Sequence, residues 1–167
     1  KMIGHLLGFE AGNSDAGGAP DPWWIVNSDL AFVFEDYTED NTDEGNDQSL
    51  HVKKARQAKT HPNWLRTEVG LSDATHIESV IITQADYIDD GARSHVKDVS
   101  VWKLEDFLDW ADNSLGVVRE LRADFPGPGD TEWREKAAQR YVENRMDPTS
   151  LVEYFASRKV VDLLETK

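Results

Sequence analysis

Two acidic residues of this sequence are spaced so that their side chains could act together. Residues 23–26 and 30–37 are rich in aromatic and β-branched residues and are predicted to be strands. The polar residues 27–29 between them are typical of a turn. A three-residue turn makes paired residue numbers sum to 56, which puts Asp21 opposite Glu35 on one face of the hairpin, with Cβ atoms about 4.5–5.5 Å apart.

Two carboxylates at this separation repel one another, and each raises the pKa of the other unless a cation lies between them. Hard divalent ions prefer such oxygen ligands, so the pair predicts a site for Mg²⁺ or Mn²⁺. The alternative is that Asp21 only opens a turn in the segment Ala-Pro-Asp-Pro and that Glu35 is a solvent-facing strand end. The register of the hairpin decides between the two.

Three segments around this pair resemble the restriction-endonuclease-like PD-(D/E)xK nuclease superfamily. They are LLGFEAGNSDAGGAPDPWW, FVFEDYTE and VKKARQAKTHPNWL, and the resemblance covers roughly residues 1–104. It implies an α/β fold with a mixed central sheet flanked by helices. It also matches Glu10 to a glutamate that the family supplies from a helix, Asp21 to the Pro-Asp element, and Glu35 to the acid of the next strand.

The sequence departs from the family at the lysine that follows this acid by two residues, because the position holds Tyr37. A tyrosine, with an ordinary pKa near 10, cannot carry a fixed positive charge. Some members move the lysine to the next helix, where Lys53 and Lys54 are candidates. The spacing of Lys53, Gln57 and His61 at intervals of four residues favours Lys53.

The expected reaction is metal-assisted hydrolysis of a phosphodiester, with DNA favoured as the nucleic acid. The residues expected to be catalytic are Asp21, Glu35, Lys53 and Gln57. Those expected to hold Mg²⁺ or Mn²⁺ are Glu10, Asp21 and Glu35. Those expected to bind nucleic acid are Lys54, Arg56, Lys59 and His61. Two alternatives stay open: a catalytically inactive nuclease-fold domain that binds DNA or a protein, and an α/β interaction domain unrelated to nucleases.

Composition limits the class of protein. The chain has 167 residues, a net charge of −14 and no cysteine, which suits one compact domain without disulfides or thiolate metal sites. It has neither a signal-peptide pattern nor an apolar run of about 20 residues, so we expect a cytoplasmic protein without a membrane partner. Because the charge opposes general binding to polyanions, a fused or associated helicase, translocase or other protein is an expected partner.

The remaining pattern predicts the order of the elements. We expect an α/β core over residues 1–125, with an N-terminus cut from a longer chain, and a helical extension over 126–167 packed on that core. The expected helices are 2–11, 48–60 (stopped by Pro62), 104–122 and two more that begin after the caps Asp130 and Asp147; further strands are expected at 78–83 and 98–104, and a polar loop at 40–47. Packing or surface roles are expected for His5, His51, His76 and His95.

Overall fold

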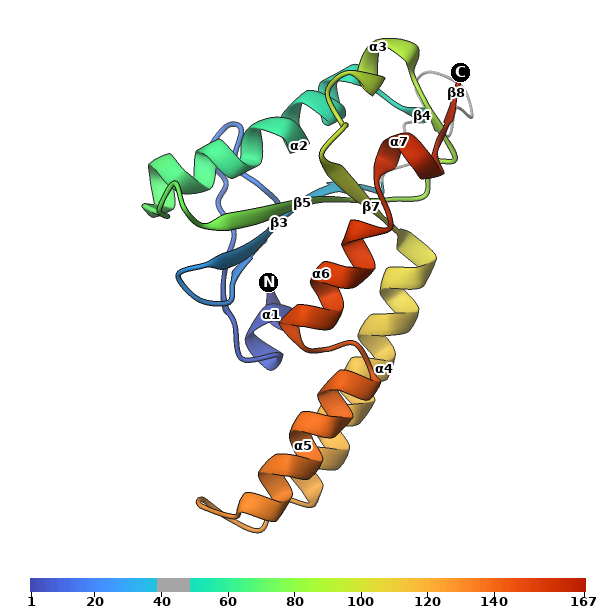
Figure 1. The fold of residues 1–167 in the computed structure, drawn as a ribbon. Helices are drawn as coiled ribbons and strands as arrows, with labels where there is room; N and C mark the ends of the chain where they lie inside the picture. Colours follow the sequence, from blue (N-terminus) through green and yellow to red (C-terminus); the bar gives the residue numbers. More distant parts are fainter. Residues whose placement is uncertain (39–48) are drawn as a thin grey trace.

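The computed structural model describes residues 1–38 and 49–167 as a mixed α/β fold, with helices on both faces of a central sheet (Figure 1). In chain order the elements are α1 (Met2–Leu6), β1 (Glu10–Gly12), β2 (Trp23–Ile25), β3 (Leu30–Tyr37), β4 (Ser49–Leu50), α2 (Val52–Trp64), the π-helical turn η1 (Leu65–Val69), β5 (His76–Thr83), β6 (Tyr87–Ile88), α3 (Asp90–Arg93), β7 (Val99–Lys103), α4 (Leu104–Ala123), α5 (Thr131–Glu143), α6 (Pro148–Ala156), α7 (Val160–Leu163) and β8 (Glu165–Thr166). The loop predicted at 40–47 lies outside the described residues.

The central sheet has the strand order β1-β2-β3-β5-β7. Its first three strands are antiparallel, whereas β5 and β7 continue in parallel from β3, so the predicted mixed sheet is confirmed. The hairpin register is also confirmed, since Trp23 pairs with Val33 and paired numbers sum to 56. The turn forms because the side-chain oxygen of Asn27 accepts hydrogen bonds from the backbone N–H groups of Asp29 and Leu30, at 2.8 and 3.0 Å.

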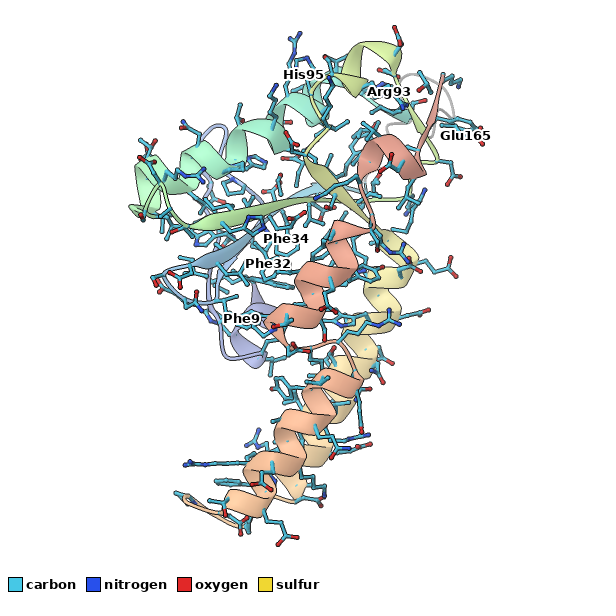
Figure 2. The ribbon with its side chains drawn as sticks, in the orientation of Figure 1. Phe9, Phe32, Phe34, Arg93, His95 and Glu165 are labelled. Carbon is cyan, nitrogen blue, oxygen red and sulfur yellow. The ribbon has the colours of Figure 1, made fainter. Side chains whose placement is uncertain are left out.

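Both faces of β3 are buried, because side chains alternate along a strand and helices cover each face. Figure 2 shows Phe32 and Phe34 on the side of the sheet where α1 and α6 lie, together with Phe9. The odd-numbered residues of β3, among them Val33 and Glu35, face α2 instead. The α2 side of the sheet therefore combines apolar packing with one buried carboxylate.

The first predicted helix, over residues 2–11, is too long. Gly8 adopts a left-handed backbone with φ of 89°, which suits glycine and ends the helical segment after Leu6. Glu10 then opens strand β1 and pairs with Ile25. The glutamate that the resemblance implies on a helix is therefore a strand residue.

The predicted end of the second helix at Pro62 is wrong, because α2 continues to Trp64 and the chain turns away only after η1. Proline removes the N–H that would bond to the carbonyl four residues earlier, that of Ala58. Ser79 on β5 replaces it, donating from Oγ to the Ala58 carbonyl at 2.8 Å. The helix consequently passes through Pro62 and keeps His61 on the side that faces the sheet.

The C-terminal part contributes to the core. The predicted caps are confirmed, since the side chains of Asp130 and Asp147 accept hydrogen bonds from the backbone N–H groups of Trp133 and Ser150. Helix α6 packs on β5 and β7, while α4 and α5 run side by side away from the sheet (Figure 1). The extension is not purely helical, because β8 joins β4 and β6 in a small second sheet. None of the helices described combines the length and apolarity that crossing a bilayer requires.

Candidate active site

Glu35 is a buried carboxylate near the end of β3, with a side chain that is only 1% exposed. His61 donates from Nε2 to Oε2 of Glu35 at 2.6 Å, and Lys54 donates from Nζ to Oε1. Burial by itself would raise the pKa of Glu35, but the hydrogen bonds from His61 and Lys54 outweigh it and hold the pKa below its ordinary value. The α2 side of the sheet therefore keeps an ionised carboxylate.

Helix geometry explains why Lys54 and His61 reach the same group. Each residue advances about 100°, so these two residues, seven apart, differ by about 20° from two full turns. Lys53 lies about 100° away from Lys54 and is exposed. Equal intervals of four residues drift around the helix by about 40° at each step, so Lys53 does not share the direction of His61 that Lys54 shares. The structure places Lys54, and not Lys53, against Glu35.

Asp21 comes to the same end of the hairpin through an irregular pairing before β2. Pro22 has no N–H, so the Phe34 carbonyl receives its hydrogen bond from the N–H of Asp21, while the Phe34 N–H donates to the Pro22 carbonyl, both at 2.9 Å. Partial desolvation and the negative charge of Glu35 raise the pKa of Asp21 above its ordinary value. The predicted pair therefore interacts electrostatically.

Glu10 does not join this pair. It pairs with Ile25, which pairs with Ala31, four residues and about 13 Å along β3 from Glu35. Within residues 1–38 and 49–167, no three histidine, aspartate or glutamate side chains are grouped closely enough to hold a metal ion. The two remaining carboxylates fit Mg²⁺, which commonly binds one or two carboxylates and completes its shell with phosphate and water.

Gln57 and His61 contribute buried polar atoms on the inner side of α2. Gln57 Oε1 and His61 Nδ1 have no hydrogen-bond partner among the described residues. His61 is 0% exposed, so the prediction that it binds nucleic acid is wrong. The reason is the continuation of α2 past Pro62, which turns the ring toward Glu35.

The outer side of α2 is basic, and the helix contains no acidic residue. Arg56 and Lys59, which the sequence predicts to contact phosphates, are exposed there, and Arg56 donates from Nε to His95 Nε2 at 3.3 Å. Lys54, also predicted to bind phosphates, points to Glu35 instead. The helix thus directs Lys54 toward the carboxylate of Glu35 and its other cations toward solvent.

A cavity of about 590 Å³ adjoins the Glu35 cluster (Glu35, Lys54 and His61). Tyr37, at the position of the family's lysine, is on its wall and donates its hydroxyl to the Ser49 carbonyl at 3.1 Å. Charges of both signs surround the cavity. Its lining residues are Asp21, Asp36, Tyr37, Thr38, His51, Lys53 and Lys54.

His51 lies at this cavity although the sequence predicts only a packing or surface role for it. Its Nδ1 lies 2.9 Å from Oδ2 of Asp89. The two residues are 38 positions apart, and no motif links them. The position of His51 directly before a basic helix is the only local signal that could have drawn attention to it.

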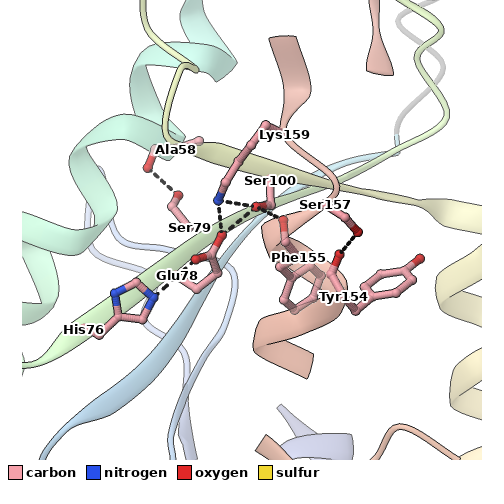
Figure 3. Close-up of polar contacts among 9 residues, drawn as sticks. All are labelled: Ala58, His76, Glu78, Ser79, Ser100, Tyr154, Phe155, Ser157 and Lys159. Atoms are coloured by element: carbon pink, nitrogen blue, oxygen red, sulfur yellow. Dashed lines mark hydrogen bonds and ion pairs between the residues drawn. The ribbon is translucent and has the colours of Figure 1, made fainter. Parts of the chain in front are cut away.

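A second buried carboxylate, Glu78, lies on the opposite face of the sheet (Figure 3). Ser100 donates to its Oε1 at 2.5 Å and Lys159 at 2.7 Å, while His76 Nε2 lies 3.4 Å from Oε2. Lys159 also donates to Ser100 Oγ at 2.9 Å. This Glu78 cluster (Glu78, Ser100, Lys159 and His76) ties the segment after α6 to β5 and β7.

Comparisons with protein-family models, with curated proteins and with solved structures found no match to this chain. The Glu35 cluster, Asp21 and the adjoining cavity are the features with the most chemical content.

Proposed function

We propose that the chain is a nuclease domain of the PD-(D/E)xK type that hydrolyses phosphodiester bonds in DNA with a divalent metal ion. The observation that carries the proposal is that Lys54 of α2 contacts Glu35 of β3 beside Asp21. A lysine from the helix thereby supplies the positive charge that Tyr37 cannot. The order Pro-Asp, acid on the next strand and lysine on the following helix agrees with the resemblance in the sequence.

Asp21 and Glu35 are the residues that would hold Mg²⁺ or Mn²⁺. When bound, such an ion lowers the pKa of a coordinated water and stabilises negative charge on the phosphoryl group. Lys54 orients the attacking water and offsets the negative charge around it. His61 fixes the Glu35 carboxylate by its 2.6 Å hydrogen bond, and Gln57 offers an unpaired acceptor one turn away.

DNA would reach this site along the exposed cations of α2. Lys53 is on the rim of the cavity, and Arg56 and Lys59 follow on the outer side of the helix. Contacts of this kind position a nucleic acid without reading its sequence. Because the whole chain carries a net charge of −14, tight binding is expected to need a fused or associated helicase, translocase or other protein.

The second candidate is an inactive nuclease-fold domain that binds DNA or a protein. It is favoured by the small number of carboxylates, since Glu10 lies apart from Asp21 and Glu35. Both carboxylate oxygens of Glu35 are also already bonded, one to Lys54 and the other to His61. A domain of this kind would keep the ion pair as a structural element and bind no cation.

The test combines calorimetric titration of Mn²⁺ with incubation of plasmid DNA in the same metal. Asp21→Ala and Glu35→Ala are expected to lose Mn²⁺ binding and to lower cleavage more than about 100-fold. Glu153→Ala removes an exposed carboxylate from α6 and serves as the matched control. A wild-type chain that binds no Mn²⁺ and leaves the plasmid intact would contradict the proposal, and DNA binding without cleavage would favour the second candidate.

A further inference from the structure

The small second sheet brings His51 beside Asp89. Strands β4 and β6 pair in parallel, with Ser49 opposite Tyr87 and Leu50 opposite Ile88, a constant offset of 38 residues. The next step of this register puts His51 opposite Asp89, and the Asp89 N–H donates to the Leu50 carbonyl at 3.2 Å. Backbone pairing therefore holds the two side chains together at the edge of the cavity.

The hydrogen bond between these side chains defines which nitrogen of His51 is available. Asp89 occupies the N-cap position of α3, but its carboxylate makes no capping bond and instead meets His51 Nδ1 at 2.9 Å. An ionised carboxylate only accepts hydrogen bonds, so Nδ1 carries a hydrogen. Among the described residues Nε2 has no hydrogen-bond partner, and His51 lines the cavity that Asp21 and Lys54 also line.

The exposure of His51 separates it from a histidine kept for packing. Its side chain is 33% exposed, whereas His61 is fully buried between α2 and the sheet. The imidazole ring of His51 packs edge to face with the ring of Tyr37, and the two ring centroids are 6.2 Å apart. A carboxylate that orients one nitrogen and leaves the other to a cleft is the arrangement by which proteins prepare histidine for proton transfer.

We propose that His51 is the general acid that protonates the leaving oxygen during phosphodiester cleavage, with Asp89 as its positioning residue. The inference rests on the proposed nuclease function. A water oxygen forms a bond to phosphorus while the phosphorus–oxygen ester bond breaks, and the leaving oxygen takes the proton from Nε2 of protonated His51. The attacking water releases a proton to solvent, and neutral His51 regains one from solvent, so the reaction consumes only water.

The test compares two substrates that differ in their need for an acid. Plasmid DNA loses an alkoxide that must be protonated, whereas bis(4-nitrophenyl) phosphate loses a stabilised phenolate that needs no proton. His51→Ala is expected to lower cleavage of DNA about 100-fold and to leave release of 4-nitrophenolate nearly unchanged. Asp89→Asn is expected to lower cleavage of DNA about tenfold with the same selectivity, because it removes only the orientation.

Comparison of the substrates separates this role from a structural one, since a misfolded variant would lose both activities equally. His5→Ala changes an exposed histidine of α1 and is the matched control, expected to cleave both substrates at the wild-type rate. Equal losses on both substrates, or full cleavage of DNA by His51→Ala, would overturn the assignment. A wild-type chain that cleaves neither substrate would instead contradict the proposed nuclease function.

Discussion

The two faces of the central sheet each bury a glutamate that is paired with a lysine, but the two arrangements differ in how completely they are satisfied. On one face, Glu78 is bound by Lys159 and Ser100, and the lysine and serine also bond to each other (Figure 3). On the other face, Glu35 is bound by Lys54 and His61. A second carboxylate, Asp21, lies close enough for the charge of Glu35 to raise its pKa.

The two clusters differ in whether buried polar side-chain atoms beside them have a hydrogen-bond partner. In the Glu78 cluster no buried side-chain atom is without a partner, as far as the described residues extend. Near Glu35, Gln57 Oε1 and His61 Nδ1 are buried and unpaired, and Lys54 borders a cavity of about 590 Å³. Unpaired buried groups cost stability unless water, an ion or a substrate reaches them, and the two beside Glu35 are the ones that lie next to a charged cavity. We therefore interpret the first cluster as structural and the second as functional.

Removing the lysine from each cluster is expected to give the largest difference between the two. Lys54→Met is expected to lower DNA cleavage about 100-fold, because the charge beside the attacking water is lost. Lys159→Met is expected to leave the rate unchanged, because Lys159 donates to Glu78 and Ser100 on the opposite face of the sheet. The measurement is the cleavage rate with saturating Mn²⁺ at a temperature where both variants are folded.

Lys53→Met is the matched control for Lys54, since the two residues are adjacent on α2 and differ in which side they face. It is expected to weaken binding of DNA and to leave the maximal rate nearly intact. The opposite result, with Lys53 essential and Lys54 dispensable, would mean that the helix supplies its catalytic charge from the rim of the cavity.

The Glu78 cluster should show its role in stability. Glu78→Ala removes the acceptor of both Lys159 and Ser100, and leaving a buried hydroxyl and a partly buried ammonium unpaired is expected to cost about 2–3 kcal/mol. The free energy of unfolding in urea measures this loss, and Glu153→Ala on the surface of α6 provides the reference. A Glu78→Ala variant as stable as that reference would remove the structural interpretation.

The local parts of the fold were predictable because their causes lie within a few residues. The turn at 27–29 sets the hairpin register through the side chain of Asn27, and Asp21 comes near enough to Glu35 for the charge of Glu35 to raise its pKa. Before β2 the pairing becomes irregular, because the Phe34 carbonyl accepts from the N–H of Asp21 while the Phe34 N–H donates to the Pro22 carbonyl. Caps at Asp130 and Asp147 were predictable for the same local reason.

Two of the errors have a different cause, which is compensation from a distant part of the chain. Pro62 should end a helix, but Ser79 satisfies the carbonyl that the proline leaves free, and the longer helix then buries His61. His51 meets Asp89 through a sheet whose strands have two residues each, too short for any periodic signal. Both contacts depend on the packing of β5 and β6 against α2 and β4, which no local pattern encodes.

The smallest expected effect concerns the stability cost of holding Asp21 near Glu35. A carboxyl whose pKa is higher in the folded than in the unfolded chain destabilises the folded state above the folded pKa and has no effect below the unfolded one. Asp21→Asn should therefore raise the free energy of unfolding in metal-free buffer at neutral pH. Since Asp21 is exposed and screened, the gain is expected to be a few tenths of a kcal/mol.

This gain should vanish as the pH falls toward the ordinary aspartate value of 3.8, where the wild-type carboxyl becomes neutral as well. Glu35 titrates with the opposite sign: its pKa is lowered, so its stabilising contribution is lost as the pH falls through the folded value. At neutral pH, Mn²⁺ should make the wild-type chain more stable to unfolding than Asp21→Asn, the reverse of the order without metal. The reason is that a cation bound to the folded wild type stabilises it, whereas Asp21→Asn has lost a ligand. Urea unfolding with and without Mn²⁺ measures the reversal. If Mn²⁺ does not reverse the order, Asp21 and Glu35 bind no cation, and the Glu35 cluster is as structural as the Glu78 cluster across the sheet.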